Sequence, residues 1–288
     1  MVITMTDALQ LIEQQLSSGS KAQKKIGSYL LANYTTAAGM TAARLAVAVG
    51  TSESTVVRYA AELGYRGYPE LQAALKESIR GKLTSLQRME LSRASTGGET
   101  FARSMRADME NIKRTLAETD AHIFDEIAER LVKARGIYII GMRSTAGLAM
   151  VLDFYLSLLL ENVQRLQAAT GGESFEQLLT VDERDVVIGI SFPRYSRRTL
   201  NALDFSHKQN AYVCAVTDCP GSPVVRFADT VIYAHNENDG FVDSLVAPMA
   251  VLNALIAAVA AKRPQECAAR LSRLEQLWEE YDVYNKTR

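Results

Sequence analysis

The stretch VVIGISFPRYSRRTL, Val186 to Leu200, decides the fold of the second half of the chain. It begins as a short apolar run and passes through Ser191 into a segment crowded with hydroxyl and guanidinium groups. A short, continuous apolar run is typical of a strand that is buried on both faces. The polar segment predicts the start of a helix. The junction is therefore a candidate anion site, because helix N-termini present free N–H groups.

Comparable apolar runs occur on both sides of this stretch, and predicted helices alternate with them. Alternating strands and helices with nearly continuous apolar strands predict a parallel sheet covered by helices on both faces. The five predicted strands are residues 136–141, 162–167, 185–191, 211–218 and 229–234.

The first part of the chain, residues 6–78, has a helical pattern in short pieces. Thr41 is expected to cap a helix that Gly50 ends, and Ser52 to cap the next helix. Two short helices joined by a glycine-containing turn describe a helix-turn-helix, although a helical hairpin packed against other helices is the alternative.

The second of these helices is expected to contact DNA, with Val56, Val57 and Leu63 on its apolar side. Hydroxyl, arginine and tyrosine side chains suit base edges and phosphates. The candidate DNA-binding residues are Thr41, Ser52, Glu53, Ser54, Thr55, Arg58, Tyr59 and Arg66.

The charge of the chain is unevenly distributed. Its 288 residues carry a formal net charge of −1, but residues 1–90 hold 10 Lys and Arg against 7 Asp and Glu. This mildly basic front permits a nucleic-acid partner. The three cysteines have no metal-ligand spacing, so we expect a cytoplasmic protein without a metal or cofactor. The longest apolar stretch, residues 244–261, contains Pro248 and Asn253 and predicts a buried helix in place of a membrane span.

Two predicted strand ends carry hydroxyl groups. At the first, Gly141 allows a turn, and Ser144 and Thr145 then open a helix beside Arg143. The second is the junction that begins at Ser191. Hydroxyls, helix amides and arginines suit a phosphate or a carboxylate, whereas no glycine-rich nucleotide motif is present in the sequence. In the alternative interpretation these serines only cap helices.

Several segments of the second half resemble a sugar isomerase (SIS) domain: GMRSTA, ISFPRYSRRTL, VTDCPGSPVVRFAD and FVDSLVAPMAVLNAL. The front segment, residues 40–75, resembles the helix-turn-helix of the RpiR/MurR family of bacterial transcriptional regulators. The resemblance implies an all-helical head followed by a SIS-type α/β sandwich with a five-stranded parallel sheet. The implied domains are 1–80 (DNA-binding), 81–120 (linker with a hinge at 92–99, and a connecting helix), 121–264 (SIS) and 265–288 (helical tail).

The resemblance also implies an effector site. SIS domains usually bind phosphosugars through a loop of the form I-S-x-S-G-E-T-x-x-T, and in this chain Pro193, Arg194 and Tyr195 stand where Ser, Gly and Glu are usual. The expected effector is therefore an anionic sugar derivative. The candidate effector-binding residues are Arg143, Ser144, Thr145, Ser191, Arg194, Tyr195, Ser196 and Thr199.

The implied function is a transcriptional regulator that binds a palindromic double-stranded DNA operator as a dimer or tetramer. The long apolar helix after residue 243 is expected to offer the face for self-association. One alternative is an isomerase, for which His235, Glu237 and Asp239 after the last strand are candidate bases. A second alternative is a metabolite sensor whose helical head docks on a protein.

Overall fold

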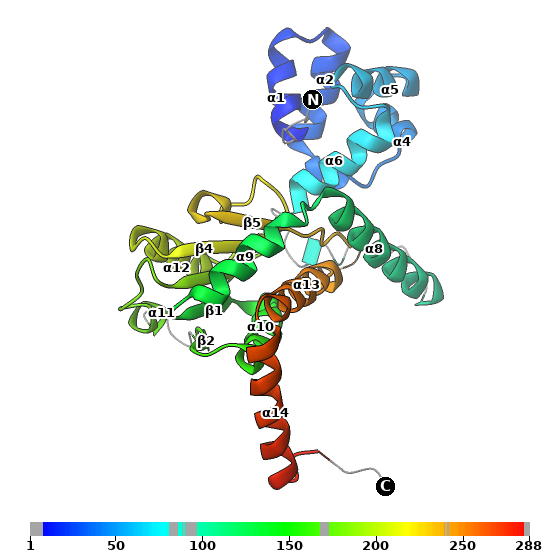
Figure 1. The fold of residues 1–288 in the computed structure, drawn as a ribbon. Helices are drawn as coiled ribbons and strands as arrows, with labels where there is room; N and C mark the ends of the chain where they lie inside the picture. Colours follow the sequence, from blue (N-terminus) through cyan, green and yellow to red (C-terminus); the bar gives the residue numbers. More distant parts are fainter. Residues whose placement is uncertain are drawn as a thin grey trace. The chain divides into compact units, whose positions relative to one another are not determined.

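The computed structural model describes residues 8–80, 86, 87, 89, 97–167, 173–238, 240 and 242–284. The chain divides into two compact units, Met1–Ser95 and Thr96–Arg288 (Figure 1). Most of the expected hinge at 92–99 lies outside the described residues.

The first unit is helical throughout its described part. Its core contains Ile12, Ile26, Leu30 and Leu45, none of which is exposed to solvent. Its helices are α1 (Ala8–Ser18), α2 (Lys21–Ala32), α3 (Tyr34–Ala37), α4 (Ala42–Val49), α5 (Glu53–Glu62) and α6 (Tyr68–Arg80).

The helix-turn-helix predicted from the sequence is present as α4 and α5. Thr41 caps α4, because its hydroxyl accepts a hydrogen bond from the Arg44 amide at 3.3 Å. Gly50 ends the helix in the left-handed region, with φ +70°, a conformation that glycine adopts without steric cost. Ser52 then caps α5 by accepting from the amide of Thr55 at 3.2 Å.

The second unit is built on one sheet of five parallel strands, as the sequence predicts. The strand order is β2-β1-β3-β4-β5. The strands are β1 (Ile137–Gly141), β2 (Val163–Arg165), β3 (Val186–Ile190), β4 (Tyr212–Thr217) and β5 (Thr230–Tyr233).

Helices cover both faces of this sheet. One face packs on α9 (His122–Lys133), α10 (Ala146–Leu159) and α13 (Val246–Lys262). The other packs on α12 (Arg197–Lys208), which follows the short α11 (Glu173–Gln177). Successive side chains of β3 point to opposite faces of the sheet. Ile188 packs in the core with α9, α10 and α13, and Val187 packs in the core with α12.

One side of the long apolar helix α13 belongs to the core of the unit. Val251, Leu252, Leu255 and Val259 are buried in the core that α13 forms with the sheet, α9 and α10. Burial of these side chains within the unit accounts for much of the apolar run, and self-association through the rest of α13 stays a prediction.

Two further helices complete the unit: α8 (Gly97–Glu118) before the sheet and α14 (Pro264–Glu280) after it. In the part of the chain described, no one helix has the length and apolar character to cross a membrane. Only α13 and α14 taken together pass that test, and they are bent by 104° at their junction. The three cysteines are free thiols.

Candidate functional site

The carboxyl ends of three neighbouring strands lie side by side in the sheet. Gly141 at the end of β1 pairs with Ile190 of β3, which in turn pairs with Val216 of β4. The chain leaves β1 for β2 on one side, and β3 lies on the other side. Such a switch point opens a crevice at the carboxyl ends of the strands, where ligands bind in open α/β sheets. Both hydroxyl-bearing segments predicted from the sequence begin at this edge.

The first segment makes a tight turn at Gly141. A Cβ atom there would lie 2.5 Å from the carbonyl oxygen of Thr145, so only glycine fits. Arg143 and Ser144 are exposed, and Arg143 has φ +59°. Thr145 differs from the expectation, because its side chain is buried and its hydroxyl lies 3.0 Å from the Ile190 carbonyl, to which it donates. Thr145 therefore joins the end of β1 to β3 and does not offer its hydroxyl to an effector.

The second segment keeps a left-handed backbone without glycine. Arg194, which stands where SIS loops usually have glycine, has φ +66°. This conformation costs a non-glycine residue roughly 1–2 kcal/mol. Backbone strain of this kind collects at functional sites, where the surrounding structure enforces it. Arg194 thus adopts a backbone conformation that glycine adopts without steric cost, although it carries a long side chain.

Helix α12 begins with amides that are only loosely capped. Ser196 accepts from the Thr199 amide at 3.5 Å, and Ser191 accepts from the Ser196 amide at 3.4 Å. Both distances exceed the usual 2.7–3.2 Å of an N–H···O bond. The first turn of α12 therefore retains donor capacity for an anion.

Thr199 supplies a second donor at the same place. Its side chain is fully buried, yet its hydroxyl oxygen has no hydrogen-bond partner among the described residues. Leaving a buried hydroxyl unpaired costs about 1–3 kcal/mol. This hydroxyl and the loosely capped amides beside it make the first turn of α12 a candidate anion site.

Tyr195 occupies the position where SIS loops usually have glutamate, and it is held by Asp218, the residue directly after β4. Its hydroxyl donates to the Asp218 carboxylate, 2.9 Å from Oδ1 and 3.1 Å from Oδ2. The hydroxyl of Thr217 also donates to Asp218, at 3.1 Å. Burial raises the pKa of Tyr195, and the charge of Asp218 raises it further, so the phenol stays neutral. The site thus contains a buried carboxylate, which the sequence analysis missed although Asp218 ends a predicted strand.

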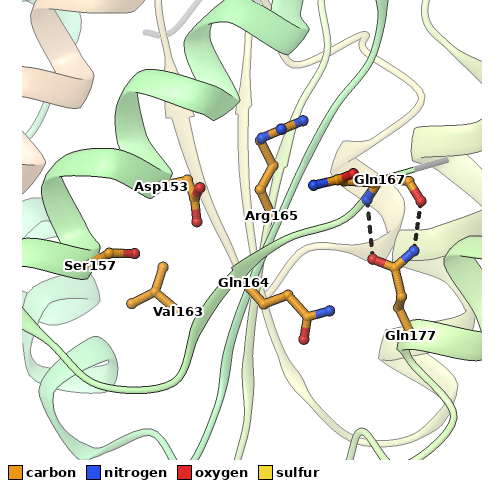
Figure 2. Close-up of a pocket in the computed structure, with 7 residues that line it drawn as sticks. All are labelled: Asp153, Ser157, Val163, Gln164, Arg165, Gln167 and Gln177. Carbon is orange, nitrogen blue, oxygen red and sulfur yellow. Dashed lines mark hydrogen bonds between the residues drawn. The ribbon is translucent and has the colours of Figure 1, made fainter.

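A separate pocket of about 480 Å³ lies beside β2, and none of the predicted effector residues lines it (Figure 2). Gln177 closes one side, where its side chain exchanges two hydrogen bonds with the backbone of Gln167, at 3.1 and 2.6 Å. Burial raises the pKa of Asp153 although the charge of Arg165 opposes the shift. The lining residues are Asp153, Ser157, Val163, Gln164, Arg165, Gln167 and Gln177.

The candidate bases after β5 are engaged by α8. Glu237 forms an ion pair with Arg114 at 2.5 Å, and His235 Nε2 lies 2.8 Å from the Glu118 carboxylate. Burial lowers the pKa of His235, but its hydrogen bonds with Glu237 and Glu118 outweigh this and raise it. Burial likewise opposes ionisation of Glu237, yet His235 and Arg114 lower its pKa to about 2. Asp239 lies outside the described residues.

In the head, the orientation of α5 differs from the expectation at two residues. Tyr59 is buried, with its hydroxyl packed over Gly27, whereas Val57 is exposed. The buried face is Val56, Tyr59 and Ala60, which follows the helical spacing i, i+3, i+4. Tyr59 is therefore a core residue and not a DNA contact.

The outward face of α5 carries Glu53, Ser54, Val57 and Arg58. Ser52 joins two of the candidate hydroxyls, lying 2.9 Å from Ser54 Oγ and 2.7 Å from Thr55 Oγ1.

Arg66 and Lys25 are cations of the head outside α5. Arg66 pairs with Glu70 at 3.1 Å, which offsets its charge. The ammonium of Lys25 comes within 3.5 Å of a Cβ built on Gly50. Lys25 therefore places a cation at the turn between α4 and α5, and the cluster of lysines in α2 could have indicated this.

These two units define a class: a helix-turn-helix head joined to an α/β domain of the kind that binds small ligands. Residues 6–82 match the helix-turn-helix domain of the rpiR family, and residues 130–258 match the SIS domain. The chain belongs to the rpiR family of helix-turn-helix regulators with a SIS domain.

The relatives and the solved structures agree with this assignment. An HTH-type transcriptional regulator of Providencia stuartii is 25% identical over 85% of this chain and 86% of its own length. The regulator HexR of Pseudomonas aeruginosa is 23% identical over 94% and 95%.

Among solved structures, the SIS domain of an RpiR transcription factor from Sphaerobacter thermophilus has a TM-score of 0.58 at 28% identity, covering 61% of this chain and 97% of its own. Vibrio vulnificus NanR, complexed with ManNAc-6P, has a TM-score of 0.58 at 17% identity over 95% and 98%, which shows the same fold.

Proposed function

We propose that this chain regulates transcription by binding double-stranded DNA through α5 and an anionic sugar derivative through the edge formed by β1, β3 and β4. The observation that carries the effector half is the buried, unpartnered hydroxyl of Thr199 at the N-terminus of α12. The operator is expected to be palindromic, and the protein to act in the cytoplasm.

The effector is expected to carry both an anionic group and hydroxyl groups. Loosely capped amides and the Thr199 hydroxyl suit a phosphate or a carboxylate. Asp218 would repel a second anionic group. Its carboxylate can, however, accept hydrogen bonds from sugar hydroxyls, either beside the bond from Tyr195 or after Tyr195 has moved away. The complex of the similarly folded NanR with ManNAc-6P supports a phosphosugar as the first compound to test.

The DNA half of the proposal rests on the outward face of α5. Ser54 and Arg58 can donate to base edges or phosphates, and the exposed Val57 can contact the methyl group of thymine. Lys25 beside the preceding turn suits a backbone phosphate.

We further propose that the SIS domain binds its ligand without catalysis. Isomerisation of a sugar requires a base that reaches the substrate. The candidate bases Glu237 and His235 are engaged by Arg114 and Glu118 of α8.

The decisive experiment is fluorescence anisotropy of the full chain on DNA from the upstream region of its own gene. Titrations at two salt concentrations, with and without a panel of sugar phosphates and sugar acids, test both halves of the proposal. Tight, salt-sensitive binding that one compound shifts is the expected result. Absence of specific DNA binding at both salt concentrations would refute the regulatory role.

Two variants test DNA binding and effector binding separately. Arg58→Ala should weaken DNA binding and leave effector affinity unchanged. The double variant Ser191→Ala with Ser196→Ala should still bind DNA and lose the response to the effector. An equal loss of both activities in either variant would contradict the division between head and SIS domain.

A further inference from the structure

The pocket beside β2 is separate from the strand ends proposed for the effector. β2 is an edge strand of the sheet and pairs with β1 alone among the described strands. Figure 2 shows Asp153 and Ser157 of α10 on one side of the pocket and Gln177 of α11 on the other. Its volume of about 480 Å³ falls within the roughly 300–1,000 Å³ that is usual for small-molecule sites. The pocket is therefore large enough for a small ligand of its own.

Both walls of the pocket are held by hydrogen bonds. The side chain of Gln177 accepts from the Gln167 amide at 3.1 Å and donates to the Gln167 carbonyl at 2.6 Å, which fixes the chain after β2. On the other side, Arg270 of α14 donates to the Ser157 carbonyl at 3.0 Å and supports the end of α10. A site whose walls are already in place loses little conformational entropy when a ligand binds.

Two opposite charges line the pocket. Asp153 and Arg165 are both half-buried, and neither forms an ion pair with a residue that the structure describes. The Asp153 carboxylate accepts a hydrogen bond from the backbone amide of Arg165, and a carboxylate can accept several more. Arg165 keeps donor capacity as well, because its Nε has no partner among the described residues. The formal charges of the two side chains cancel, so neither a strongly anionic nor a strongly cationic ligand is favoured.

Most of the remaining lining consists of amide and hydroxyl groups. Gln164 and Gln167 contribute amides, Ser157 contributes a hydroxyl, and Val163 is the one apolar residue among the described residues that line the pocket. Amides and hydroxyls both donate and accept hydrogen bonds, and so does each hydroxyl of a sugar. An apolar ligand would leave these groups unpaired. We propose that the pocket binds a neutral polyhydroxylated ligand, namely a sugar or polyol that carries neither a phosphate nor a carboxylate.

The roles of the two charged side chains follow from this class of ligand. Asp153 accepts hydrogen bonds from hydroxyl groups of the ligand, and Arg165 donates to its hydroxyl or ring oxygens. At the edge formed by β1, β3 and β4, by contrast, the amides of α12 favour a negative charge. The two sites therefore select different ligands. The inference goes beyond the proposed function, because it requires neither DNA nor the anionic effector.

Isothermal titration of the full chain with uncharged sugars and polyols tests the proposal. Glucose, mannose, myo-inositol and mannitol are compared with glucose 6-phosphate, gluconate and glycine. At least one of the neutral compounds should bind saturably at one site per chain. Inorganic phosphate should leave its affinity unchanged, so failure of this proposal is separable from failure of the proposed function. Asp153→Asn should weaken the binding about tenfold or more, because a hydrogen bond to a charged group is lost.

A second variant and a control locate the binding. Gln164→Leu should weaken it as well, because it removes an amide from the lining. Gln209→Leu is the matched control, since Gln209 is an exposed glutamine of the same unit outside the pocket, and it should bind normally. Circular dichroism should show a folded chain in every variant. The proposal is overturned if no neutral compound binds saturably at millimolar concentration, if only charged compounds bind, or if Asp153→Asn and Gln164→Leu both bind normally.

Discussion

The unpartnered hydroxyl of Thr199 leads to an unusual expectation, namely a substitution that stabilises the free protein and impairs binding. Thr199→Val replaces a buried hydroxyl that has no partner among the described residues with a methyl group of similar size. The penalty for an unpaired buried hydroxyl is about 1–3 kcal/mol. The free energy of unfolding should therefore rise by about that amount in the absence of effector. For a unit of this size, each kcal/mol raises Tm by about 2–4 °C.

Effector affinity should change in the opposite direction. A hydrogen bond to a charged group contributes about 1.5–3 kcal/mol, so its loss should raise Kd roughly 10- to 150-fold. Urea unfolding of the free protein measures the first effect. Isothermal titration with inorganic phosphate, and with any compound that shifts DNA binding, measures the second.

Ser206→Ala is the matched control for Thr199→Val. Ser206 is equally buried in the same helix, but its hydroxyl donates to the Ala202 carbonyl at 2.8 Å. Loss of this bond is offset by the higher helix propensity of alanine, so stability should change by less than about 1 kcal/mol. Effector affinity should not change. A Thr199→Val protein that is less stable than the natural one, or that binds the effector normally, would refute the assignment of Thr199 to the site.

Three other predictions concern the head and α8. Tyr59→Phe removes a buried hydroxyl without a partner and should raise the free energy of unfolding by about 1 kcal/mol, measured by urea unfolding; a loss of stability would contradict this. Because the pKa of His235 is raised, its stabilising contribution should be complete below about pH 6.5 and be lost as pH rises through the raised pKa. His235→Gln should remove that dependence of the urea midpoint, and an unchanged pH profile would count against it. Val57→Asp should weaken DNA binding by tenfold or more in anisotropy titrations, since it sets a carboxylate against DNA, whereas normal affinity would place α5 elsewhere.

The sequence identified the strand-end loops because their chemistry is local. A strand end followed by a serine and a helix start presents amides at one edge of the sheet wherever the chain goes next. Ser191, Ser196 and Thr199 could be named for this reason. Asp218 could not, because its relation to the loop depends on Tyr195, which is 23 residues away in the chain. The two residues meet only because β3 and β4 are neighbours in the sheet.

The sequence by itself determined the caps and the element types. Thr41, Gly50 and Ser52 act within their own turns. Short apolar runs that alternate with helical segments predicted the strands of the sheet. Only the tertiary structure decided which side of an amphipathic helix is buried. In α5 the apolar residues Val56, Val57 and Tyr59 are compatible with two orientations of the helix about its axis. The packing of Tyr59 over Gly27 of α2 selects one of them. In α8 the apolar side chains face outward, because the polar groups of the loop after β5 are satisfied by its polar side chains. Burial is a property of the neighbouring surface, and the pattern within a single helix does not contain that surface.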